Sequence, residues 1–127
     1  MSDGLTPEQT ERVVAIAMDF ARDGSTGELG EFIEHGLPVN TVDDAGNTLL
    51  MLAAYHGHAG TVRALLELGA DPNLRNDRDQ TPIAGALFKG ADDVVSVLSE
   101  AGADLDAGTP TARAAATMFG REHLLPS

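Results

Sequence analysis

The sequence predicts an all-α fold, a solenoid of stacked helix–turn–helix units, on the basis of three observations. Glycines recur at an offset of 33 residues, as in Gly24, Gly57 and Gly90. Threonines that can cap a helix precede short apolar segments, and these segments carry apolar residues at helical spacing. Helices shorter than about 12–15 residues are barely stable alone in water. Short repeated helices must therefore gain their stability from contacts between neighbouring units.

A second glycine series, Gly36, Gly69 and Gly102, has the same offset of 33 residues. Helices commonly end at a residue in the left-handed conformation, which glycine adopts without steric penalty. Two such glycines in each unit predict two short helices per unit. The same offset relates further pairs of identical residues, namely Thr48 and Thr81, Ala53 and Ala86, Val62 and Val95, Leu65 and Leu98, and Ala70 and Ala103.

The first unit begins with the longest predicted helix, residues 7–23. Thr6 can cap this helix, and Pro7 suits its first position, where no amide hydrogen is needed. Gln9 completes a capping box, because its side chain can reach back to the cap residue. We expect the partner helix over residues 26–35.

The second and third units repeat this arrangement, with Thr48 and Thr81 as the expected caps. The predicted helices are 48–56 and 59–68, followed by 81–89 and 92–101. Helically spaced apolar residues mark the second helix of each unit: Leu29, Phe32, Ile33, Val62, Leu65, Leu66, Val94, Val97 and Leu98.

The last unit is shorter. Thr109 and Pro110 repeat the Thr-Pro start, so we expect a helix over 110–118 and a short one over about 121–125. The unit lacks three to five residues, depending on whether Gly120 or Thr109-Pro110 is used to align it.

With these features in place, the residues resemble the ankyrin repeat. The second unit, DDAGNTLLMLAAYHGHAGTVRALLELGADPN, follows the family pattern but has Leu49 and Met51 where Pro and His are usual. Its matching positions are Asp43, Gly46, Thr48, Leu50, Leu52, Ala53, Ala54, Gly57, His58, Val62, Leu65, Leu66, Gly69, Ala70, Asp71 and Asn73. The third unit departs from the pattern at Asp79, Gly85, Ala91, Ser99 and Asp106.

The resemblance covers nearly the whole chain, and it is strongest over residues 41–106. It implies one ankyrin-repeat domain over 1–127, with units at about 5–40, 41–73, 74–106 and 107–127. The terminal units are divergent, as expected for polar caps. Protruding turns are expected near residues 41–47, 74–80 and 106–109.

Composition excludes several functional classes. The formal charge of −12 disfavours binding to nucleic acids and to anionic membranes, since both require clustered cations. The acidic balance has two interpretations, solubility or attraction to a basic partner, and solubility is favoured. The chain has no cysteine and no signal-peptide pattern, so we expect a cytoplasmic protein. A strong preference for arginine over lysine, with abundant alanine and glycine, suggests a bacterial source.

The resemblance implies protein binding through the turn tips and the exposed face of each first helix, which together form the concave surface. The predicted partner-binding residues are Arg22, Asp44, Asn47, Tyr55, His56, Asp77, Arg78, Gln80, Phe88 and Lys89, with Asp23 and Ala45 beside them.

Tyr55 and Phe88 are the most informative of these residues. They are 33 positions apart, so they should lie side by side along the array. Aromatic anchors ringed by polar groups are typical of interface hot spots. The alternative is that both rings pack against the neighbouring turn.

No motif predicts catalysis, a metal site or a cofactor. His56 and His58 are two positions apart with Gly57 between them, so they do not share a helix face. The resemblance instead gives His58 a structural role, a hydrogen bond to turn backbone. His35 and His123 lie near predicted helix ends, where capping or surface roles are expected. The glycine-rich segment 24–30 lacks the lysine of a phosphate loop.

Acidic pairs have structural interpretations as well. Asp43 matches a turn-stabilising position, and Asp92 and Asp93 lie in the first turn of a predicted helix, where negative charge is favourable.

Three functional hypotheses remain. The first is a non-catalytic module that binds a protein partner and is itself a monomer. The second is self-association through an apolar patch of Met118, Phe119, Leu124 and Leu125. The third is a small-ligand or enzyme site between the turns, built from Asp44, His56 and Asp77.

Overall fold

The computed structural model describes residues 4–126, and the helices expected from the sequence are present. The all-α prediction is therefore confirmed. In chain order the helices are α1 (Pro7–Asp23), α2 (Thr26–Glu34), α3 (Leu49–Tyr55), α4 (Ala59–Glu67), α5 (Pro82–Lys89), α6 (Asp92–Glu100) and α7 (Ala112–Phe119), followed by the 3-10 helix η1 (Glu122–Leu124). None of these helices is long and apolar enough to cross a membrane.

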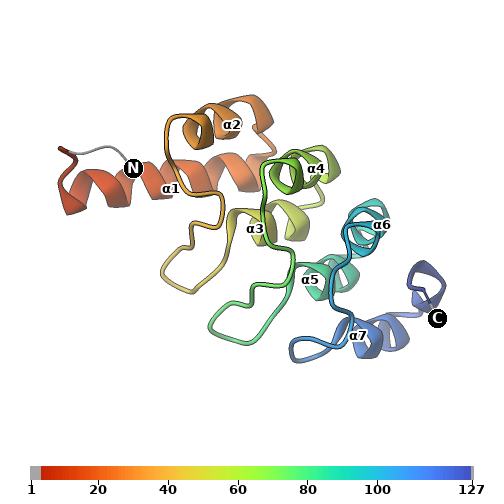
Figure 1. Ribbon diagram of the computed structural model, residues 1–127. Coiled ribbons are helices and arrows are strands. Elements are labelled where there is room, and N and C mark those ends of the chain that lie inside the picture. Colours follow the sequence, from red (N-terminus) through yellow and green to blue (C-terminus); the bar gives the residue numbers. More distant parts are fainter. Residues whose placement is uncertain (1–3, 127) are drawn as a thin grey trace.

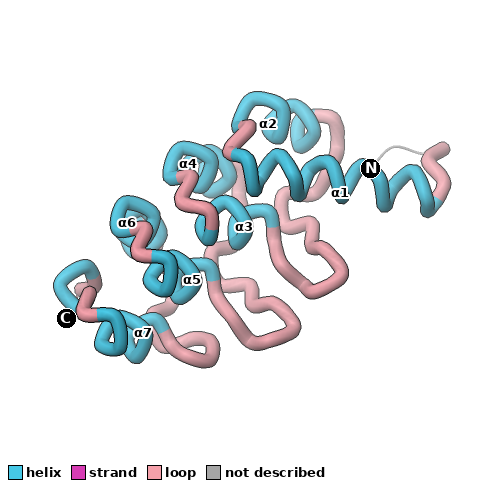
Figure 2. The backbone as a smooth tube through the Cα atoms, turned by 180° about the vertical axis from the view of Figure 1, so that it is seen from behind, coloured by secondary structure: helices cyan, strands magenta, loops and turns pink. Residues whose placement is uncertain are grey.

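The helices form two rows (Figures 1 and 2). Helices α1, α3, α5 and α7 contact one another in order, and α2, α4, α6 and η1 form a second row alongside them. Each pair is antiparallel and adjoins the next pair in sequence. The long turns between pairs project beyond the helices on one side, as the pink segments of Figure 2 show. The stack follows the order of the chain, as expected for a repeat array.

The core lies between the two rows. Leu50 of α3, Leu65 of α4, Leu87 of α5 and Leu98 of α6 are almost completely buried. Of the apolar residues predicted for the second helices, Leu29, Val62, Leu65, Val94, Val97 and Leu98 are buried, and Phe32, Ile33 and Leu66 pack partly buried against them. The short helices thus become stable by packing together, because no single helix could bury its apolar face alone.

The predicted helix starts are confirmed for α1, α3 and α5. Thr6 Oγ1 accepts the amide hydrogen of Gln9 at 3.1 Å, and Gln9 Oε1 accepts that of Thr6 at 2.9 Å, which is the expected capping box. Thr48 and Thr81 cap α3 and α5 in the same way, each accepting from the third residue of its helix. Every glycine of the two 33-residue series has a positive φ.

The predicted start of the last helix was wrong. Thr109 does not cap it; α7 begins at Ala112, and Thr111 Oγ1 accepts the amide hydrogen of Ala114 at 3.1 Å. Thr109 is already used, because its amide and hydroxyl both donate to Asp79 of the preceding turn. The expected final helix is a single 3-10 turn. Helix α7 ends at Gly120, which is therefore the correct alignment point for this unit.

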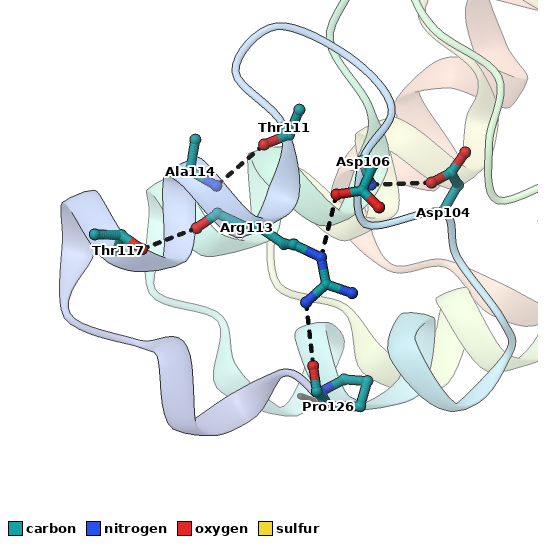
Figure 3. A network of polar contacts seen from close by, with 7 residues as sticks. All are labelled: Asp104, Asp106, Thr111, Arg113, Ala114, Thr117 and Pro126. Carbon is teal, nitrogen blue, oxygen red and sulfur yellow. Dashed lines mark hydrogen bonds and ion pairs between the residues drawn. The ribbon is translucent and has the colours of Figure 1, made fainter.

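Arg113 links the segment after η1 to the turn that precedes α7 (Figure 3). Its Nε donates to Asp106 Oδ1 at 3.1 Å, and its Nη1 donates to the carbonyl of Pro126 at 3.3 Å. Leu124 and Leu125, which precede Pro126, pack partly buried against the core. The short last unit thus covers the apolar end of the stack.

Candidate partner-binding surface

The two central turns are held rigidly by matching side chains. In the first turn Asp43 Oδ1 accepts the amide hydrogens of Ala45 and Asn47, each at 2.9 Å. In the second turn Asn76 Oδ1 accepts those of Arg78 and Gln80, each at 3.0 Å. The turn-stabilising role expected for Asp43 is confirmed. In each turn, one short polar side chain stabilises the tip by accepting hydrogen bonds from backbone amides of that turn.

Hydrogen bonds also join one turn to the next. Asn76 Nδ2 donates to Asn47 Oδ1 at 2.8 Å, and the amide of Asp77 donates to the carbonyl of Ala45 at 2.9 Å. The turns and the first-row helices therefore form one continuous surface, on which side chains are presented at fixed positions.

A groove of about 630 Å³ lies on this surface, between the turns and helices α3, α5 and α7. Its lining residues are Asn47, Met51, Leu52, Tyr55, His56, Asn76, Arg78, Gln80, Thr81, Ala84, Gly85, Phe88, Pro110, Ala115, Met118 and Phe119. Turn residues form the polar side, and helix residues form the apolar side. We call it the aromatic groove.

The repeat register explains why the surface is hollow here. Counting back from the glycine that ends each first helix, the fifth position is Leu52 in α3, Gly85 in α5 and Ala115 in α7. A Cβ placed on Gly85 would lie 3.5 Å from Cδ1 of Tyr55, an ordinary contact distance. Gly85 thus leaves room beside Tyr55 that a larger side chain would fill, and Ala115 is the small residue at the same position of α7.

Aromatic rings line the groove in sequence. Tyr55 and Phe88 are stacked, with centroids 6.4 Å apart and planes 11° apart, and Phe119 meets Phe88 edge-on at 5.6 Å. Tyr55 and Phe88 remain 38% and 60% exposed. The rings therefore pack on one another and still face solvent, and binding by this pair stays a prediction. Exposed aromatic surface of this kind is available to a partner.

Positive groups surround the rings. Lys89 Nζ lies 5.0 Å from the centroid of Tyr55, within cation–π range. Arg78 lines the groove itself, and so does His56, whose charge depends on the pH. Partial burial lowers the pKa of His56, and the neighbouring charges of His58, Arg22 and Lys89 lower it further. The lowered pKa favours the neutral form of His56.

A second, smaller hollow of about 410 Å³ lies beside α1 and the first turn. Its polar lining differs from that of the aromatic groove, because carboxylates dominate it. Arg22 lies here and is paired with Asp19 at 2.8 Å. The lining residues are Thr10, Glu11, Val14, Ala15, Met18, Asp19, Arg22, Val42, Asp43 and Asp44.

The ten residues predicted to bind a partner do not all lie at one site in the structure. Six of them line the aromatic groove: Asn47, Tyr55, His56, Arg78, Gln80 and Phe88. The Nζ of Lys89 lies over the ring of Tyr55, and Asp77 lies exposed at the second turn. Arg22 and Asp44 line the other hollow. The constellation of Asp44, His56 and Asp77 considered for a ligand site is therefore not brought together.

Met118 and Phe119 belong to the groove but were not among the predicted binding residues. Aligning the last unit on Gly120 places Met118 at the position of Tyr55 and Phe88, two before the glycine. That alignment would have identified Met118, which is 66% exposed. The predicted apolar patch for self-association is reduced accordingly, since Phe119, Leu124 and Leu125 are partly buried.

His58 has a structural role, but its Nε2 donates to the carbonyl of Arg22 in the last turn of helix α1, at 2.7 Å, and not to the backbone of a turn between units as expected. His35 Nδ1 likewise bonds the carbonyl of Glu31 at 2.7 Å, at the end of α2. Across residues 4–126, no group of three or more His, Cys, Asp or Glu side chains is arranged to hold a metal ion.

Comparison with known proteins agrees with the repeat architecture. A family model described as ankyrin repeats (many copies) matches residues 33–86. A protein of Pseudomonas aeruginosa named as an ankyrin repeat protein is 42% identical over 62 residues, which cover 46% of this chain. The match covers 36% of that relative, so the chain spans about a third of its length.

Proposed function

The chain is an ankyrin-repeat protein, and we propose that it is a non-catalytic module that binds a protein partner through the aromatic groove. Ankyrin repeats generally mediate interactions between proteins. The observation that carries the proposal is the stacked pair of Tyr55 and Phe88, exposed in a groove ringed by polar side chains. Such rings bury large apolar area on binding while losing little conformational freedom.

The polar rim supports the same proposal. Asn47, Asn76 and Gln80 are already joined by hydrogen bonds, so the rim is ordered before a partner arrives. Preorganisation lowers the entropic cost of association. A rigid polar rim around an apolar centre is the arrangement that excludes water from interface hot spots.

A cytoplasmic location, a bacterial source and a monomeric state are parts of this proposal that rest on composition and repeat pattern. Self-association is the less favoured alternative, because most of the apolar side chains of the last unit are turned towards the core. Met118 is the exposed member of the predicted apolar patch, and it lines the groove that we assign to the partner.

Filling the groove tests the proposal. Gly85→Leu should place an apolar side chain beside Tyr55, where a Cβ meets only ordinary contact distances. Leucine is also a better helix former than glycine, by somewhat less than the ~1 kcal/mol that separates glycine from alanine, so the fold should not lose stability. We therefore expect Gly85→Leu to abolish binding while the thermal unfolding midpoint stays the same or rises.

The measurement is affinity capture from a bacterial lysate with identification by mass spectrometry. The baits are wild type, Gly85→Leu and the double variant Tyr55→Ala/Phe88→Ala. Leu68→Ala is the control, because Leu68 is an exposed apolar residue at the end of α4, outside the groove lining. A partner retained by wild type and Leu68→Ala but lost by both groove variants supports the proposal. Equal capture by all four proteins, or capture of nothing, contradicts it.

A further inference from the structure

We infer that the occupant of the aromatic groove is an apolar peptide segment that carries carboxylates. This inference rests on the proposed function, and it identifies the chemistry of the partner. The groove contrasts in charge with the rest of the chain. The formal charge is −12, with 20 acidic residues against 8 basic ones, yet within residues 4–126 no Asp or Glu lines the groove.

The positive groups at the groove are available. Within the part of the chain that the structure describes, Arg22, Arg75, Arg113 and Arg121 are each paired with a carboxylate, whereas Arg12, Arg63, Arg78 and Lys89 form no ion pair. Of these four unpaired groups, Arg78 lines the groove and Lys89 lies over Tyr55. In a chain with an excess of acidic groups, an unpaired arginine beside an apolar groove is the group that can bind an incoming carboxylate. Such charge-assisted hydrogen bonds are about twice as strong as neutral ones.

The positions of these cations set the shape of the occupant. Arg78 lies on the turn side of the groove, and Lys89 lies over Tyr55 on the helix side. Tyr55, Phe88 and Met118 provide apolar surface along the groove. A segment with one or two bulky apolar side chains and acidic residues beside them would match both features. The volume of about 630 Å³ lies in the usual range for a bound group of that size.

Most carboxylates of the concave surface line the other hollow, whereas Asp77 lies exposed on the second turn beside Arg78, outside the groove lining. Asp19, Asp43 and Asp44 line the hollow beside α1, and Glu11 joins them. A basic segment would be drawn to that hollow, whereas an acidic one is excluded from it. Electrostatic complementarity of this kind selects partners and sets the direction in which a segment lies.

The test uses a library of short random peptides selected for binding to the full chain. The affinities of the selected peptides are then measured by fluorescence polarisation. The variants are Phe88→Ser, which removes the ring, and Arg78→Glu and Lys89→Glu, which reverse the charge. The matched controls are Leu68→Ser and Arg63→Glu, which make the same changes at exposed positions of the α4 segment, outside the groove lining. Circular dichroism melts check that every variant is folded.

We expect selected peptides to be enriched both in Asp or Glu and in bulky apolar residues. Their affinity should fall about tenfold or more with Phe88→Ser and with Arg78→Glu, where tenfold corresponds to ~1.4 kcal/mol. Lys89→Glu should weaken binding as well, and the two controls should leave it unchanged.

Other outcomes separate this inference from the proposed function. Basic peptides that still require Phe88 would overturn the inference and leave the groove as a binding site. Acidic peptides that are insensitive to both charge reversals would also overturn it. Peptides insensitive to Phe88→Ser, or no selected peptide at all, would overturn both. Sedimentation showing self-association that Phe88→Ser removes would identify a second copy of the chain as the occupant, against the inference.

Discussion

The junction between the first two helix pairs and the junction between the second and third share one backbone geometry but differ in their side chains. Gly24 caps the end of α1 and has a φ of 73°. Gly57, the corresponding residue one unit later, follows α3 and has a φ of 79°. At the first junction the His58 ring lies over Gly24, and its Nε2 donates to the carbonyl of Arg22. At the second junction Ala91 occupies the place of His58, and a Cβ on Gly57 would meet nothing within 4 Å.

The second row shows the same difference. The hydroxyls of Thr26 and Thr61 are 2.7 Å apart at the first junction. One unit later, the corresponding residues are Ala59 and Val94, which cannot form this bond. The first junction is therefore joined by polar contacts on both rows, and the second depends on apolar burial and the linked turns.

The glycines and buried residues thus recur at each junction, whereas the residue after the second and later of these glycines differs and with it the side-chain contact to the preceding unit. The last junction supports this view. Arg121 follows Gly120, and its Nη2 would lie 3.0 Å from a Cβ on Gly90. Its Nε is paired with Asp92 Oδ1 at 2.7 Å. A flexible arginine thus replaces the histidine.

The largest expected effect is that of Gly24→Val, which should break the first junction. A Cβ on Gly24 would lie 2.7 Å from Nδ1 of His58, and valine also disfavours a positive φ. We expect a loss of about 3 kcal/mol or more, combining backbone strain with overpacking. Gly57→Val should lose only the strain component, about 1–2 kcal/mol. Urea denaturation of both variants measures the difference, and equal losses would contradict the role given to His58.

The next effect is that of His58→Ala, which removes the ring without adding strain. The carbonyl of Arg22 loses its donor, and the space over Gly24 opens, so we expect a loss of roughly 1–3 kcal/mol. Chemical denaturation provides the value. In the double variant with Gly24→Val, the two losses should not add, because the alanine relieves the clash. Full additivity would show that the ring and the glycine do not interact.

A smaller effect of opposite sign is expected for Ala91→His, which would give the second junction the side chain of the first. By the 33-residue register, the new ring should cover Gly57 and donate to the carbonyl of Tyr55. One additional hydrogen bond should stabilise the fold by about 0.5–1.5 kcal/mol. A rise in the thermal unfolding midpoint would support the comparison. A variant that is less stable than wild type would mean that the second junction has no room for the ring.

The smallest expected effect is the contribution of His56, near the first junction, to the pH dependence of stability. Burial lowers the pKa of His56, and His58 and Arg22 lower it further. A histidine with a lowered pKa in the folded state contributes full stability above its ordinary pKa, and that contribution decreases as the pH falls through the lowered value. Between about pH 7 and pH 5, wild type should therefore lose slightly more thermal stability than His56→Gln. Parallel pH profiles of the two proteins would contradict this assignment.

Most of the fold could be predicted because its signals are local. Caps such as Thr6, Thr48 and Thr81 act within three residues of themselves, and the glycines act at their own backbone. The offset of 33 residues is sufficient to predict that Tyr55 lies beside Phe88, and the two rings are indeed stacked. The failure at Thr109 has the opposite cause, since its hydroxyl bonds Asp79, 30 positions away.

The sequence by itself determined the helices, their order and the register of the units, because short-range hydrogen bonding and apolar periodicity act within a few residues. Only the tertiary structure decided which predicted binding residues share one groove. It separated Arg22 and Asp44 from the others and added Met118 and Phe119. The reason is that a groove depends on the space left between side chains of different units. That space beside Gly85 and Ala115 arises only when the units are packed together.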